Sequence, residues 1–152
     1  MNADTTATDG ETSTEVARRA LLIPVGRDLH ALPMASVREV VSAPLVTPLP
    51  TAPPTVLGVF NLRGEIVPLF DTAALLGFGA AGERAFAVVV ESALGPAGFA
   101  ATAFPESVEL GEPIGATETD GTIAVYAVGS RLATLLDLEV LLAPARIGGW
   151  SA

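Results

Sequence analysis

Short apolar runs separated by turn residues dominate the chain. The first pair of runs spans residues 20–32 around Gly26-Arg27-Asp28, and the last spans residues 122–136 around Gly129-Ser130. Apolar runs of this length, joined by short turns rich in glycine and polar residues, are typical of β-hairpins. The pattern therefore predicts a hairpin near each end of the chain.

Residues 58–71 form the most densely patterned stretch. Two apolar runs flank Arg63-Gly64, and Gly64 allows the chain to reverse because it has no Cβ. We predict two strands with Arg63 at the tip of their turn. Asp71 is placed to cap a short helix over residues 72–76.

The remaining segments are shorter or less regular. Residues 35–41 predict a short helical turn or an irregular strand, and the five prolines within residues 43–54 predict an ordered, extended connection over the surface. Residues 85–90 predict a buried strand. A turn at residues 95–98 and a partner strand over residues 99–104 are expected to follow.

An internal repeat links the two halves. Residues 66–76 align with residues 132–142 at an offset of 66, and each copy reads as a strand, a capping Asp and a helix ending in Leu-Leu. This repeat predicts two β units of roughly 60–65 residues each, over about residues 20–80 and 84–143. Units of that size are marginal alone and gain stability by sharing a core. Coincidence between two common strand-helix junctions is the alternative interpretation.

Composition supports an all-β domain. Gly and Pro supply 15 and 12 of the 152 residues, which favours short strands and turns. Residues 1–17 predict a disordered acidic tail, the domain is expected over residues 18–143, and residues 144–152 predict a flexible C-terminus.

Charge and hydropathy exclude several classes of function. The net charge is −9 and the eight basic residues are scattered arginines, which argues against a nucleic-acid partner. The most apolar stretch, residues 85–104, is interrupted by a glutamate, a proline and two glycines, so we expect no direct membrane insertion. The chain has no Cys and no signal-peptide pattern, and a cytoplasmic location is expected.

Catalytic chemistry has little support. His30, the single histidine, has no sequence-adjacent partner, and a structural or surface role is favoured over a catalytic or metal-binding one. Glu106, Glu109 and Glu112 are spaced three apart and predict a solvated acidic edge rather than a metal site. We expect no enzyme activity, no catalytic residues, no metal and no cofactor.

Arg63 is the strongest candidate for a functional residue. A guanidinium at the tip of a turn presents five donors in a fixed fork, which suits a carboxylate or a partner's carbonyl groups. Glu39 is its most plausible intramolecular partner. A structural ion pair and a partner-binding role are both open, and the two are compatible.

The motifs resemble those of the CheW family, the coupling proteins of bacterial chemotaxis. The resemblance covers about residues 20–143 and is most specific in the first half, where it is carried by Val37-Arg38-Glu39-Val40-Val41, the proline-rich residues 47–54, residues 58–71 and Leu75-Leu76-Gly77. The second half matches less closely. Gly129-Ser130-Arg131 also stands where the first copy of the repeat has Arg63-Gly64-Glu65.

The resemblance implies a fold and a set of partners. The fold would be two intertwined five-stranded SH3-like barrels sharing a core, with a short helix after the last hairpin of each barrel. The protein would be a non-catalytic adaptor that couples the cytoplasmic tips of methyl-accepting chemoreceptors to the regulatory domain of a CheA-type histidine kinase, recruited to membrane-associated receptor arrays.

Site residues are carried over position by position. Val37, Glu39 and Val40 match the family's receptor-contacting segment, and the family's Asn-Leu-Arg-Gly turn is matched by Asn61, Arg63 and Gly64. Two other functions stay open: a small β-barrel sensory module for a soluble ligand, and a CheW-like scaffold in a phosphorelay unrelated to motility.

Overall fold

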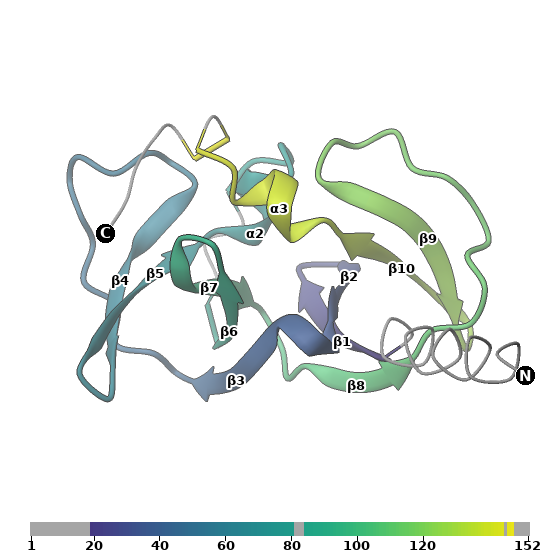
Figure 1. Ribbon diagram of the computed structural model, residues 1–152, viewed down its shortest axis with the longest axis horizontal. Helices are drawn as coiled ribbons and strands as arrows, with labels where there is room; N and C mark the ends of the chain where they lie inside the picture. The colour runs from purple at the N-terminus through teal and green to yellow at the C-terminus, as the bar shows by residue number, and fades with distance from the viewer. Residues whose placement is uncertain (1–18, 81–83, 145, 148–152) are drawn as a thin grey trace, which may run out of the picture.

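Ten short strands carry almost all of the regular structure in the computed structural model (Figure 1), which describes residues 19–80, 84–144 and 146–147. The predicted acidic tail, residues 1–17, lies outside the described residues. The elements in chain order are β1 (Arg19–Val25), β2 (Asp28–Pro33), the 3-10 helix η1 (Met34–Ser36), β3 (Val37–Ser42), β4 (Val56–Leu62), β5 (Glu65–Phe70), α2 (Thr72–Leu75), β6 (Phe86–Ser92), β7 (Gly95–Ala101), β8 (Glu106–Glu109), β9 (Thr122–Val128), β10 (Arg131–Leu136) and α3 (Leu138–Leu141).

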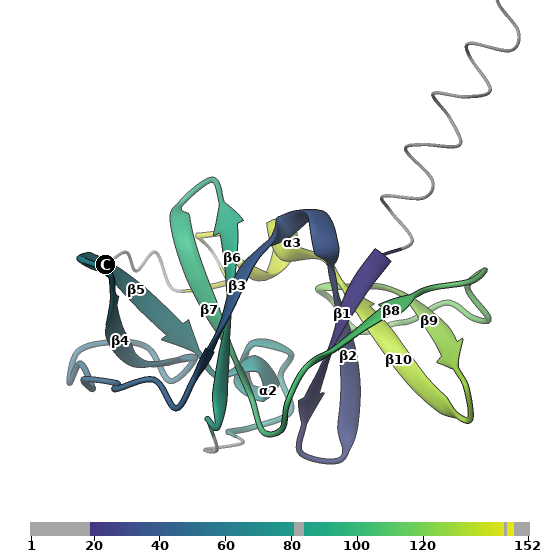
Figure 2. The ribbon, with the colours of Figure 1, turned by 90° about the horizontal axis from the view of Figure 1, so that it is seen from below.

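The strands form two five-stranded sheets that lie side by side (Figure 2). The first barrel has the order β3-β6-β7-β5-β4, and the second barrel has the order β8-β1-β2-β10-β9. The predicted all-β fold of two intertwined five-stranded units is confirmed.

The two halves of the sequence repeat exchange their first hairpins. The repeat pairs β1–β5 with β6–β10, and this correspondence converts one sheet order into the other. Hairpin β1–β2 joins the second barrel through a parallel pairing of β2 with β10, and hairpin β6–β7 joins the first barrel through a parallel pairing of β7 with β5. Each sheet therefore takes strands from both halves, and a boundary at residues 80–84 separates the repeats without separating the barrels.

The exchanged strands explain why the most apolar runs do not alternate with polar residues. In β1, Ala20 and Leu22 pack inside the second barrel, whereas Leu21, Ile23 and Val25 pack in a core shared by both barrels. Strand β6 divides its valines and alanine between the first barrel and the shared core in the same way. Such strands are buried on both faces, so both faces are apolar.

Both predicted helix caps are present. Oδ1 of Asp71 accepts a hydrogen bond from the backbone N–H of Ala74 at 3.1 Å, and Oδ1 of Asp137 accepts one from Val140 at 3.3 Å. The leucines that end each helix pack into the shared core, and both helices lie between the sheets (Figure 1). Ile147, within the segment expected to be flexible, is also buried in this core, at 1% exposure, and residues 148–152 lie outside the described residues.

The turn predicted at residues 95–98 was wrong. Strand β6 continues to Ser92, the reversal falls at Ala93-Leu94, and Ser92 Oγ accepts a hydrogen bond from the N–H of Leu94 at 3.1 Å. Gly98 lies inside β7, where an added Cβ would come within 3.2 Å of both Phe60 and Leu69. This glycine permits close packing, although in the sequence it is indistinguishable from a turn residue.

The segments before the Arg63 hairpin agree with the prediction of a short helical turn or irregular strand followed by an ordered, extended connection. Residues 35–41 contain the end of η1 and most of β3, and the pairing of β3 with β6 is irregular between Val37 and Glu39. The proline-rich connection docks on β4 through reciprocal backbone hydrogen bonds of Thr47 with Val59, at 2.7 and 2.9 Å. Gly58 makes that approach possible, because a Cβ there would lie 2.3 Å from the carbonyl oxygen of Thr47.

Candidate functional site

The β4–β5 hairpin holds Arg63 in a left-handed backbone conformation. Arg63 and Gly64 form a two-residue turn with φ of 50° and 91°, the signs that a type I′ hairpin turn requires. The side-chain oxygen of Asn61 accepts a hydrogen bond from the Gly64 N–H at 2.8 Å. An arginine is disfavoured at such a φ, and residues held this way cluster at functional sites.

The predicted pair of Arg63 and Glu39 is confirmed. Nη1 of Arg63 donates to Oε1 of Glu39 at 3.0 Å, and Nη2 donates to Oε2, so the contact is bidentate. These hydrogen bonds hold the pKa of the Glu39 carboxyl below its usual range and raise the pKa of Arg63. The Arg63 side chain remains 64% exposed, whereas Glu39 is 25% exposed.

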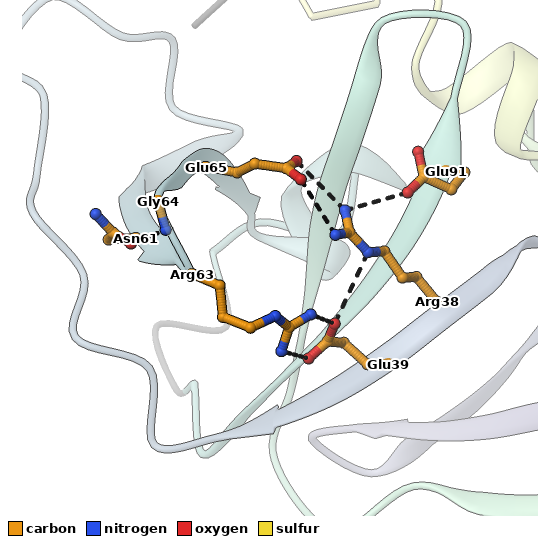
Figure 3. A network of polar contacts seen from close by, with 7 residues as sticks. All are labelled: Arg38, Glu39, Asn61, Arg63, Gly64, Glu65 and Glu91. Atoms are coloured by element: carbon orange, nitrogen blue, oxygen red, sulfur yellow. Dashed lines mark hydrogen bonds and ion pairs between the residues drawn. The ribbon is translucent and has the colours of Figure 1, made fainter.

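A second arginine extends this contact into a network that the sequence analysis missed. The guanidinium of Arg38 donates to both carboxylate oxygens of Glu65, at 3.1 and 3.3 Å, and to Glu91 at 3.2 Å. Its Nε also lies 3.8 Å from Glu39. We call Arg38, Glu39, Arg63, Glu65 and Glu91 the charged clasp (Figure 3).

The charged clasp bridges strand β3 and the β4–β5 hairpin, which no strand pairing joins directly. Strand β3 is one edge of the sheet and β4 is the other, so the barrel closes where β3 meets the β4–β5 hairpin. Arg38 and Glu39 come from β3, Arg63 and Glu65 from the hairpin, and Glu91 from β6 (Figure 3). A single chemical arrangement thus closes the barrel and leaves an arginine facing solvent.

The predicted site residues divide between this network and its neighbourhood. Glu39, Asn61, Arg63 and Gly64 lie together at the hairpin. Val40 projects from the β3 edge and is exposed, whereas Val37 packs partly against the shared core. The sequence predicted Val37, Glu39 and Val40 as one contact segment. Side chains alternate along β3, however, so Val40 lies on the opposite face from Glu39.

A groove of about 720 Å³ begins next to the charged clasp. Glu91 lines its near end, and its walls come from Ser36, the β6–β7 turn and α3. Leu94, Leu138 and Leu142 give it an apolar floor. No sequence pattern indicates this groove, since its walls come together only through the exchange of hairpins.

The second barrel has a simpler ion pair at the corresponding place. Arg131 donates to Glu106 at 3.0 Å. Glu39 lies opposite Val89, and Glu106 opposite Leu22, at equivalent points of the two sheets. Both barrels therefore join their edge strand to a hairpin through a glutamate and an arginine, but the second has Gly129 where the first has Arg63.

The described residues offer little to a metal or a membrane. Across residues 19–80, 84–144 and 146–147 there is no group of three or more His, Cys, Asp or Glu side chains able to hold a metal ion. Within the same ranges no helix has the length and hydropathy to cross a bilayer. The predicted acidic edge on β8 includes Glu106, which is engaged with Arg131.

Comparison with known proteins identifies one family. Residues 19–146 match the CheW-like domain. The chain is 30% identical over 127 residues to the chemotaxis protein CheW of Helicobacter pylori, covering 78% of this chain and 77% of that protein. It is 42% identical over 50 residues to protein FrzA of Myxococcus xanthus, covering 33% of this chain and 31% of FrzA.

A solved structure supports the fold assignment. The scaffolding protein TtCheW of Thermoanaerobacter tengcongensis superposes with a TM-score of 0.72 at 22% identity, covering 84% of this chain and 93% of that one. At that level of identity the match concerns the arrangement of strands, and it agrees with the SH3-like barrels implied by the motifs.

Proposed function

The chain belongs to the CheW-like family, and from that premise we propose that it couples chemoreceptors to a histidine kinase. The family consists of non-catalytic scaffolds of chemotaxis signalling, so the expected work is binding and positioning. The proposed partners are the cytoplasmic tip of a methyl-accepting chemoreceptor and the regulatory domain of a CheA-type kinase. The proposed location is the cytoplasm, at membrane-associated receptor arrays.

The first barrel is the proposed receptor-binding face. The observation that carries this assignment is Arg63, a charged side chain in a disfavoured backbone conformation that leaves it 64% exposed. The exposed Val40 lies on the adjoining edge strand. Arginine is one of the residue types enriched in binding hot spots.

The groove next to the charged clasp extends this face. Its apolar floor is bordered by the acidic side chains of Glu91 and Glu139. Such a groove suits an amphipathic helix whose apolar residues enter while its basic residues meet the rim. We place part of the receptor tip there, continuous with Arg63.

The second barrel is the proposed kinase-binding face. It has the same strand order as the first barrel, but its β9–β10 turn has no arginine at the position of Arg63. The two barrels therefore share a fold and differ in the chemistry of this surface. Ile114 and Ile123 supply large exposed apolar side chains there. Separate faces allow both partners to bind together, with avidity in an array compensating for modest individual contacts.

Analytical ultracentrifugation with the two partner fragments tests this function. We expect the full chain, a receptor-tip fragment and a kinase regulatory domain to sediment as a ternary complex. Leu94→Asp should remove the receptor fragment and retain the kinase domain, whereas Ile123→Asp should do the reverse. Arg84→Glu, an exposed charge change elsewhere, is the matched control. Failure of the unaltered chain to bind either fragment would overturn the proposal.

A further inference from the structure

The second barrel carries a cleft to which the proposed function assigns no role. Its volume is about 870 Å³, within the range of small-molecule sites. The walls come from the β1–β2 turn, β2, β9, β10 and the loop before β9, and Phe78 reaches it from the segment that follows α2. Residues from both halves of the repeat therefore build it.

His30 supplies a buried polar atom that lacks a partner. The side chain lines the cleft and is only 4% exposed, and its Nδ1 has no hydrogen-bond partner among the described residues. Burial lowers the pKa of His30, although the nearby Asp28 opposes that shift, so the imidazole is neutral at neutral pH. A buried ring nitrogen without a partner is uncommon in folded proteins and calls for a ligand or water.

The residues that line the cleft carry a net positive charge, whereas the whole chain is negatively charged. Arg27 and Arg131 line it together with one carboxylate, Asp28, which leaves a lining charge of +1 in a protein of net charge −9. Arg131 is engaged with Glu106, whereas Arg27 forms no ion pair within the part of the chain that the structure describes. By contrast, the groove next to the charged clasp is lined by two glutamates and no base.

Apolar groups complete the cleft. Phe78 and Leu132 line it and are both more than half exposed. Three threonines of the wall are bonded to one another, since Thr122 Oγ1 donates to the carbonyl oxygen of Thr119 and lies within hydrogen-bond distance, 2.9 Å, of Thr117 Oγ1. The groups available to a ligand therefore include a guanidinium, an imidazole nitrogen and an apolar wall.

We propose that this cleft binds a small carboxylate with an aromatic or aliphatic body. The carboxylate would pair with Arg27, the body would cover Phe78 and Leu132, and a polar substituent would meet Nδ1 of His30. A neutral ligand would gain less from Arg27, because it cannot form a charge-assisted pair, and a cation would be repelled by it. The site lies beside the kinase-binding face proposed above, since Thr122 and Val125 of the cleft flank Ile123 in β9.

An NMR titration of the ¹⁵N-labelled full chain with benzoate tests the proposal, with benzamide as the neutral isostere. We expect saturable shifts at Arg27, His30 and Thr134 with benzoate, and at least tenfold weaker binding of benzamide. Arg27→Glu should weaken benzoate binding by at least tenfold, while Arg84→Glu should leave it unchanged. Absence of saturable shifts, or equal binding of the two probes, would overturn the proposal.

His30→Leu separates the buried nitrogen from the surface charge. With 4-hydroxybenzoate as a second probe, the variant should lose affinity for the hydroxylated probe more than for benzoate. If both affinities fall equally, or neither changes, His30 has no contact with the substituent and that part of the proposal is wrong. Arg27→Glu still reports on the carboxylate in either case, because Arg27 is an exposed turn residue.

Discussion

The two barrels share a strand order but differ in how each is closed. Five charged residues close the first barrel, whereas the second has the single pair of Glu106 and Arg131. In each barrel the two edge strands of the sheet are not paired with each other, so side-chain contacts must hold that side of the barrel together. The excess charge in the first barrel, and the exposed Arg63 within it, go beyond that structural need. The comparison therefore directs the receptor-binding proposal to the first barrel.

The interiors differ as well. The first barrel encloses Phe60, Leu62 and Leu69, while the second encloses several alanines together with Leu22 and Leu135. No residue of β9 is fully buried. The second barrel thus buries fewer large side chains than the first, and the anion-binding cleft proposed above lies on it.

Core truncation should reveal the largest difference between the barrels. Phe60 is 3% exposed, and Tyr126, 66 positions later, is only partly buried. We expect Phe60→Ala to lower the free energy of unfolding by about 3–5 kcal/mol, and Tyr126→Ala to lower it by less than half as much. Urea denaturation followed by circular dichroism measures both. Equal losses would show that the two interiors are packed alike.

The second largest difference is expected where a connection docks on β4 in the first barrel and on β9 in the second. A Cβ at Gly58 would collide with the Thr47 backbone, so Gly58→Ala should cost about 2–3 kcal/mol. The equivalent position in β9 is Ala124, where a Cβ is already accommodated, and Ala124→Gly should cost only about 0.5–1 kcal/mol. Thermal unfolding of both variants tests whether Gly58→Ala is the more destabilising change. A well-tolerated Gly58→Ala would mean that the proline-rich connection moves aside.

Acid should weaken the charged clasp. Arginine hydrogen bonds lower the pKa of both Glu39 and Glu65 in the folded protein. Their contribution is therefore complete above the pKa of an unfolded glutamate, about 4.3, and is lost as the pH falls through the lower folded values. The variant Arg38→Gln with Arg63→Gln should lose less stability than the unaltered chain between pH 5 and pH 3. Parallel losses in urea midpoints would contradict this.

Local signals predicted the frame of the molecule. Asp71 and Asp137 were identified as caps because a cap depends on a few adjacent residues, and both form the expected hydrogen bonds. The pairing of Glu39 with Arg63 was also predicted correctly, since both residues stood out in short segments.

Features that depend on the approach of distant strands could not be predicted. Arg38 meets Glu65 and Glu91 only because β3, β6 and the hairpin come together at the barrel edge. Gly98 resembled a turn residue because a glycine required for close packing and one required for a reversal are the same in sequence. The apolar Ile147 gave no sign that the chain returns to the core after α3.

The most direct test of the receptor-binding role compares stability and binding in Arg63→Asn. Asparagine followed by glycine suits the type I′ turn, so this change removes the guanidinium and preserves the hairpin. We predict an unfolding temperature close to that of the unaltered chain and at least a tenfold loss of affinity for a receptor-tip fragment by isothermal titration calorimetry, with kinase-domain binding unchanged. Retained receptor affinity, or a loss of binding that follows only from unfolding, would show that Arg63 serves the barrel alone.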